Sequence, residues 1–162
     1  MGVETERKFL VCGNGWQALA TQRTHIRQAY LTTDGRASVR VRIRDDGTAA
    51  LTVKARQPGM RRLEFEYPIP PSEAESLIAL RAGGVVEKVR HIVPHKDARW
   101  EVDVFAGENA GLVIAEIELR DEHQRVELPP WVGTEVTGRD EYYSGSLAQR
   151  PFAAWGSLRA QA

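Results

Sequence analysis

The chain has 162 residues, of which 42% are hydrophobic and 27% are charged, so it predicts one globular domain and excludes wholesale disorder. Its 22 basic and 22 acidic residues give a formal net charge of zero, which argues against a general nucleic-acid binder. The single cysteine, Cys12, excludes an internal disulfide, and no stretch has the apolar character of a signal peptide or a membrane span. We therefore expect a cytoplasmic protein with no membrane partner.

Apolar and polar residues alternate along most of the chain, a pattern typical of half-buried strands. In the run from Ser38 to Arg44, three aliphatic residues face one way and three arginines face the other. The next alternating run follows a turn at Asp45-Asp46-Gly47, so the two runs predict a hairpin. The full pattern predicts eight strands, over residues 3–11, 25–31, 38–44, 51–55, 62–67, 86–93, 100–104 and 113–119.

Helical signals are few. Ser72 stands in an N-cap position before an apolar stripe, and Asp140 stands in one before residues 141–149. A short helix is also expected over residues 16–20. We expect a single domain over residues 1–155, followed by a flexible tail over residues 156–162.

The polar faces of the predicted strands are charged on almost every strand. Charges on one face of a strand usually form the solvated side of an antiparallel sheet. Here, however, charges of one sign are grouped within strands, as in Arg40 with Arg42 and Glu116 with Glu118. The alternative is a closed antiparallel barrel whose charged faces point inward, because about eight strands suffice to enclose one small ligand.

In such a barrel the lumen would hold a basic and an acidic group, and buried charges must be paired or bind a ligand. A polyphosphate with a hard divalent cation, Mg²⁺ or Mn²⁺, satisfies both groups. The basic group comprises Arg40, Arg42, Lys54, Lys88 and Arg90. The acidic group comprises Glu4, Glu6, Glu64, Glu66, Asp103, Glu116 and Glu118. The apolar faces would then point outward, and since the predicted helices are too few to cover them, we expect a homodimer.

The series of motifs resembles the CYTH superfamily, the triphosphate tunnel metalloenzymes. Glu4-Thr5-Glu6-Arg7-Lys8 is similar to the family's N-terminal ExExK signature. The later motifs follow in the family's order: Arg40-x-Arg42, Lys54, Arg62-x-Glu64-x-Glu66, Lys88-x-Arg90, Asp103 and Glu116-x-Glu118. The resemblance covers essentially the whole chain and is nearest to the compact bacterial members.

The resemblance implies an eight-stranded antiparallel closed β-barrel with a few covering helices, and metal-dependent hydrolysis of inorganic triphosphate to pyrophosphate and phosphate. It implies that the cations bind the substrate and that the carboxylates bind one or two metals, with Glu4, Glu6 and Glu118 as main ligands. It also implies that Lys8 pairs with Tyr30 to position or deprotonate water, although Tyr30 equally fits an ordinary barrel-lining aromatic. Arg62 fits either a phosphate contact at the tunnel mouth or a salt bridge.

Other functions need the same tunnel. A class IV adenylate cyclase, a nucleoside triphosphatase and a thiamine triphosphatase differ only in what grips the organic group. A non-catalytic polyphosphate-binding module would keep the cations and lose carboxylates, whereas every carboxylate position is filled here. A plain β-sandwich with charged outer faces would require the motif series to be a coincidence.

Overall fold

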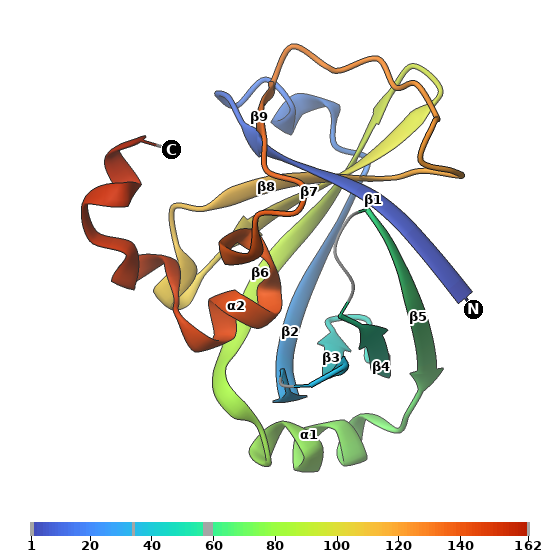
Figure 1. The fold of residues 1–162 in the computed structure, drawn as a ribbon, viewed down its shortest axis with the longest axis vertical. Helices are drawn as coiled ribbons and strands as arrows, with labels where there is room; N and C mark the ends of the chain where they lie inside the picture. The colour runs from blue at the N-terminus through green and yellow to red at the C-terminus, as the bar shows by residue number, and fades with distance from the viewer. Residues whose placement is uncertain (1, 34, 57–59, 162) are drawn as a thin grey trace.

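A computed structural model describes residues 2–33, 35–56 and 60–161, with side chains described as far as residue 156. It shows a closed antiparallel barrel of eight strands and one additional strand (Figure 1). The barrel order is β5-β4-β3-β2-β6-β7-β8-β1, and pairing of β1 with β5 closes it. The strands are β1 (Gly2–Val11), β2 (Gln22–Thr32), β3 (Ala37–Arg44), β4 (Ala49–Ala55), β5 (Arg61–Pro68), β6 (Ala82–His95), β7 (Ala98–Phe105), β8 (Val113–Glu118) and β9 (Val132–Glu135).

The predicted inward orientation of the charged faces is confirmed by the strand registers. Successive side chains of a strand point to opposite faces, and residues directly opposite on neighbouring strands share a face. Lys8 lies opposite Glu116, and Arg90 lies opposite Asp103. The register therefore sets cations beside carboxylates inside the barrel, while the aliphatic residues of the same strands face outward.

The ninth strand, β9, was not predicted, because its four residues are too short to show alternation. It pairs with the second half of β1 through Phe9 and Val11, whereas the first half of β1, Gly2 to Thr5, pairs with β5. The other edge of β1 pairs with β8. The N-terminal strand is thus held by three partners.

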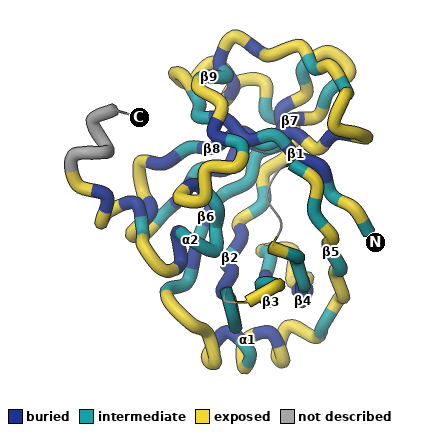
Figure 2. The backbone as a smooth tube through the Cα atoms, viewed as in Figure 1, coloured by how far each residue is buried: buried dark blue, intermediate teal, exposed yellow. Residues whose placement is uncertain are grey.

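Short helices and irregular segments cover parts of the outer surface of the barrel. On one side, Trp100 of β7 packs edge-to-face on Phe9 and Trp131, with ring centroids 5.6 and 5.8 Å apart. This cluster extends to Trp16, which directly precedes the 3-10 helix η1 (Gln17–Leu19), the observed form of the short helix predicted over residues 16–20. The coverage is therefore more complete than the sequence suggested (Figure 2).

Helix α1 (Pro71–Ala79) covers the outer face of β2, β3 and β4 through Ala74 and Ile78. The predicted N-cap at Ser72 is wrong, because the helix begins one residue earlier with Pro71 and has no side-chain cap. A proline fits the first helical position because its φ is already helical and its missing N–H has no partner there. None of the described helices has the length and apolar character required to cross a lipid bilayer.

The C-terminal segment packs into one end of the barrel. The expected continuous helix over residues 141–149 is broken at Tyr143, which is extended, into the 3-10 helix η3 (Asp140–Tyr142) and helix α2 (Ser144–Gln149). Asp140 makes no side-chain cap and lies inside η3. A further 3-10 segment, η4 (Phe152–Gln161), follows and places Phe152 and Trp155 in the same apolar cluster as α2. The tail predicted over residues 156–162 lies largely beyond residue 156, where side chains are not described.

A close backbone contact lets α2 lie against β6. Gly83 has a φ of +76°, and a Cβ added there would lie 2.6 Å from the carbonyl oxygen of Ala148. Only glycine combines this left-handed backbone with such an approach. This contact places α2 against β6 (Figure 1).

Candidate active site inside the barrel

The barrel encloses a cavity of about 450 Å³ with a strongly polar wall. The inward faces of all eight barrel strands and the C-terminal segment contribute to this wall. The predicted residues that line it are Glu4, Glu6, Lys8, Tyr30, Arg40, Arg42, Lys54, Arg62, Glu64, Lys88, Arg90, Glu116 and Glu118. Glu66 lines a neighbouring cavity that shares Glu4, Glu64 and Glu118, and Asp103 lies fully buried behind the wall.

Three carboxylates converge on the ammonium group of Lys54. Glu4 bonds to it directly, and oxygens of Glu64 and Glu6 lie 3.2 and 3.8 Å from Nζ. Burial would lower the pKa of Lys54, but the carboxylates outweigh burial and raise it. Burial also raises the pKa of Glu4, against the attraction of Lys54. The acidic part of the wall is therefore built around a cation.

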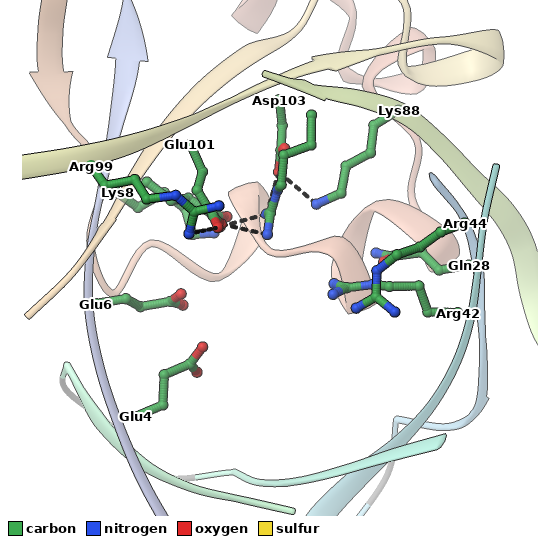
Figure 3. A network of polar contacts seen from close by, with 12 residues as sticks. Glu4, Glu6, Lys8, Gln28, Arg42, Arg44, Lys88, Arg99, Glu101 and Asp103 are labelled. Carbon is green, nitrogen blue, oxygen red and sulfur yellow. Dashed lines mark hydrogen bonds and ion pairs between the residues drawn. The ribbon is translucent and has the colours of Figure 1, made fainter. Parts of the chain in front are cut away.

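A second network joins β1, β6, β7 and β8. Lys8 bonds to one oxygen of Glu116, and Arg90 Nη2 donates to the other at 2.9 Å. Arg90 also donates two hydrogen bonds to Asp103, whose Oδ2 accepts a third from Lys88 Nζ at 2.5 Å (Figure 3). Both oxygens of each carboxylate are thus held by cations.

Burial and neighbouring charges shift the pKa values of the residues in this second network. Although burial alone would lower the pKa of Lys8, Glu116 and Glu6 raise it, so Lys8 remains an ammonium ion. Its partner Glu116 has a pKa well below the usual range, because Lys8 and Arg90 outweigh the effect of burial. Lys88 behaves differently, because burial lowers its pKa to about 8. Its partner Asp103 opposes this decrease, but Asp103 also binds Arg90, and the positive charge of Arg90 lowers the pKa of Lys88 further.

The opposite wall carries arginines with fewer anionic partners (Figure 3). Arg42 is buried, and its Nε donates to the side-chain oxygen of Gln28 at 3.1 Å. Within the part of the chain that the structure describes, Arg42 has no carboxylate partner. Burial and the nearby Arg40 and Arg90 lower the pKa of Arg42 to about 9. This wall therefore holds positive charge that an anion in the cavity would compensate.

Lys8 and Tyr30 both line the cavity, as the resemblance implied. Among the described residues, the hydrogen bond of Lys8 Nζ goes to Glu116, and none joins Lys8 to Tyr30. The ring of Tyr30 belongs to the apolar cluster at the C-terminal end of the barrel and lies beside Gly145. Their joint role in positioning or deprotonating water stays a prediction.

Several residues of the site were not predicted. Glu101 lies two residues before Asp103 on the same inward face, pairs with Arg90, and has a pKa raised by burial. The alternation that identified Asp103 also contained the signal for Glu101. Residues Tyr143 to Ser146 reach the cavity from the C-terminal segment, where no period of two marks an inward face.

The carboxylates of the acidic wall suit a hard divalent cation. The described residues contain no ready-made group of three or more His, Cys, Asp or Glu side chains that could hold a metal. Instead, the Lys54 ammonium occupies the point on which Glu4, Glu6 and Glu64 converge. Carboxylate oxygens that already surround a cation are donors of the kind that a hard divalent cation prefers.

A barrel lumen with cations on one wall and carboxylates on the other is built to hold a chain of phosphates together with a metal ion. The chain belongs to the CYTH domain family, whose pattern matches residues 2–152. It is 44% identical over 153 residues to an inorganic triphosphatase of Acetivibrio thermocellus, a match covering 94% of this chain and 97% of that protein.

A second relative, an inorganic triphosphatase of Nitrosomonas europaea, is 36% identical over 148 residues, which cover 90% of this chain and 96% of the relative. The crystal structure of the inorganic triphosphatase NE1496 superposes with a TM-score of 0.62 at 34% identity, covering 90% of this chain and 93% of that one. The predicted family and closed-barrel fold are confirmed.

Proposed function

We propose that this protein is an enzyme that hydrolyses inorganic triphosphate to pyrophosphate and phosphate inside the barrel. One observation carries the proposal: a single cavity brings together the phosphate-type cations and the metal-type carboxylates that the sequence grouped by sign. The names of the two relatives support the same substrate.

The cations bind and orient the triphosphate. Arginine suits bidentate contacts to phosphate oxygens, and lysine acts as a point charge. The phosphate-binding set is Lys8, Arg40, Arg42, Lys54, Arg62, Lys88 and Arg90. Arg42 is the strongest candidate for a first contact, because among the described residues its buried guanidinium hydrogen-bonds to the neutral Gln28 and forms no ion pair.

The carboxylates hold Mg²⁺ or Mn²⁺. Glu4, Glu6 and Glu118 are the main ligands in this proposal, with Glu64, Glu66, Glu116 and Asp103 as further ligands or supports. When bound, such an ion neutralises charge on the phosphate oxygens and lowers the pKa of a bound water. Both carboxylate oxygens of Asp103 and of Glu116 already bond to lysine or arginine side chains. These two residues therefore suit the role of holding the phosphate-binding cations in position better than that of direct metal ligands.

In the reaction, water adds to a terminal phosphorus and the bond to the pyrophosphate oxygen breaks. Lys8 acts as a charged donor, because its raised pKa keeps the ammonium protonated. Tyr30 offers a hydroxyl at the cavity wall that can orient the water. The remaining cations compensate the charge that develops on the leaving pyrophosphate.

Two broader expectations accompany the proposal. A cytoplasmic location agrees with the exposed free thiol of Cys12. A homodimer agrees with an apolar outer patch formed by Val3, Leu63 and Tyr67, which are 48%, 43% and 55% exposed. Val3 lies directly opposite Leu63 on the paired strands β1 and β5, so the patch is continuous across the barrel closure and of the kind that a second copy covers.

The experiment is phosphate release from tripolyphosphate, ATP, thiamine triphosphate and pyrophosphate, with Mg²⁺ or Mn²⁺, together with detection of cyclic AMP. The proposal expects tripolyphosphate to be the preferred substrate. Faster turnover of ATP or thiamine triphosphate, or cyclic AMP as the main product, would overturn it, and binding without turnover would indicate a polyphosphate-binding module. Arg42→Ala should weaken tripolyphosphate binding, whereas Arg27→Ala, on the outer face beside Glu75, serves as the matched control.

A further inference from the structure

Arg62 is held differently from most cations of the cavity. Lys8, Arg40, Lys54, Lys88 and Arg90 each have at least one carboxylate within ion-pair distance. Arg62 lies directly opposite Glu4 on the paired strands, yet Glu4 bonds to Lys54. Across the described part of the chain, Arg62 forms no ion pair, and its buried Nε has no hydrogen-bond partner.

The partner of Arg62 is an aromatic ring from the C-terminal segment. The guanidinium carbon of Arg62 lies 4.3 Å from the ring centroid of Tyr143. The Tyr143 hydroxyl accepts a hydrogen bond of 3.1 Å from the backbone N–H of Gly138, which ties the ring to the turn after β9. The same ring lies 4.7 Å from Nζ of Lys8. Tyr143 therefore touches two cations of the cavity from a segment that no strand register controls.

We propose that Tyr143 is a positioning residue for substrate binding, whose ring holds the guanidinium of Arg62 in place for a phosphate group of the triphosphate. The proposal rests on the proposed function, since it assigns Arg62 to the phosphate-binding set. It also decides between the two expectations for Arg62, because a guanidinium without a carboxylate partner fits the phosphate contact.

The physical reason lies in what a cation must give up to bind phosphate. A cation bonded to a carboxylate has to exchange one anion for another, so part of the new interaction replaces the old one. A guanidinium stacked on an aromatic face keeps the N–H donors in its plane available while the ring fixes its orientation. Arg62 can therefore bind phosphate without breaking an ion pair, and Tyr143 reduces the side-chain freedom that binding would otherwise remove.

The test compares variants of Tyr143 by tripolyphosphate hydrolysis and by calorimetric binding of tripolyphosphate without metal. Tyr143→Leu should raise KM and the dissociation constant roughly three- to tenfold, the range of a partly desolvated cation–π contact, and change kcat by less than about twofold. Tyr143→Phe keeps the ring and loses only the hydrogen bond from Gly138, so its KM should lie closer to that of the wild type than to that of Tyr143→Leu. Tyr143→Met offers a second non-aromatic side chain if the leucine variant does not fold.

Two comparisons separate positioning from general packing. In the double variant with Arg62→Ala, the loss from Tyr143→Leu should become much smaller, because the ring then has no guanidinium to hold and keeps only its contact with Lys8. Tyr142→Leu is the matched control: this neighbouring ring packs against Trp155, with centroids 5.2 Å apart, and does not line the cavity. Its loss should lower thermal stability and leave KM within about twofold.

Additive losses in the double variant, a Tyr143→Phe defect equal to that of Tyr143→Leu, or an equal KM increase in Tyr142→Leu would each overturn the proposal. The binding measurement keeps it distinct from the hydrolase assignment. If the wild type binds tripolyphosphate without cleaving it, and Tyr143→Leu weakens this binding, the assigned reaction fails while the positioning role stands. If the wild type cleaves tripolyphosphate and Tyr143→Leu leaves KM unchanged, the assigned reaction stands and the positioning role fails.

Discussion

Replacing Lys54 by methionine would remove the cation on which Glu4, Glu6 and Glu64 converge. The three carboxylates would then face one another with only partial access to water. Breaking a buried ion pair costs about 3 kcal/mol at the lower end of the usual range, which applies here because the four side chains keep some contact with solvent. In a chain of this size, that loss corresponds to a decrease in Tm of about 6–12 °C at pH 7.

The pH dependence of this defect follows from the sign of the charge. Burial already raises the pKa of Glu4 with Lys54 present, and removing Lys54 raises it further. A carboxylate whose pKa is higher in the folded than in the unfolded protein destabilises the fold above its unfolded pKa, and the penalty fades as the pH falls. The difference in Tm between Lys54→Met and the wild type should therefore shrink from pH 7 to pH 5.

Metal ions give the second readout. In the wild type, a divalent cation must displace the Lys54 ammonium from the carboxylates, whereas in Lys54→Met nothing competes. Addition of Mg²⁺ or Mn²⁺ without triphosphate should raise the Tm of the variant more than that of the wild type. Thermal unfolding at both pH values, with and without metal, measures all of this, and Lys96→Met, at the exposed lysine Lys96, is the matched control. A Tm at pH 7 within about 2 °C of the wild type, or an equal response to metal, would refute the reasoning.

Three further outcomes are expected. Glu6→Gln should lower tripolyphosphate turnover on the order of a hundredfold or more, because a neutral amide cannot replace the charge that a hard cation needs; its metal-free Tm should stay equal or rise, and near-normal turnover with normal metal dependence would contradict its role as a ligand. Because burial lowers the pKa of Lys88 to about 8, tripolyphosphate affinity measured by calorimetry should fall from pH 7 to pH 9 as this ammonium loses its proton; Lys88→Arg should flatten the profile, and an unchanged profile would argue against Lys88 as the titrating group. Light scattering should detect a dimer at micromolar concentration and a species of about 18 kDa for Leu63→Lys, whose charge would lie in the apolar outer patch; a wild-type monomer would contradict the proposed homodimer.

The alternation of charge along each strand predicted which side chains share a face, and the resemblance to the CYTH superfamily implied that the strands close into a barrel. A period of two assigns each side chain to a face, and the grouping of like charges indicated that the charged faces were the inner ones. Alternation alone does not give the register between strands, so it did not predict that Lys54 lies among three carboxylates or that Asp103 lies behind Lys88 and Arg90. Which cation meets which carboxylate depends on the bulges and turns that set that register.

The C-terminal part of the site was harder to predict for a different reason. Residues Tyr143 to Ser146 reach the cavity from a break between two short helical segments, and such a break has no periodicity in the sequence. The contact of Tyr143 with Arg62 joins residues far apart in the chain through a stacking geometry, which leaves no local signature. The strand β9 was missed because four residues are too few to reveal a pattern.

The three-sided pairing of β1 has a consequence for how the chain folds. Lys8 bonds to Glu116, 108 residues away, and Arg7 bonds to Glu135, 128 residues away. Closing such long loops costs entropy, so we expect the hairpins of the middle strands to form before β1 pairs with β8 and β9. The ion pairs that β1 makes with β8 and β9 are then among the last contacts to form. Substitutions of Lys8 or Glu116 should therefore speed unfolding while leaving the folding rate almost unchanged.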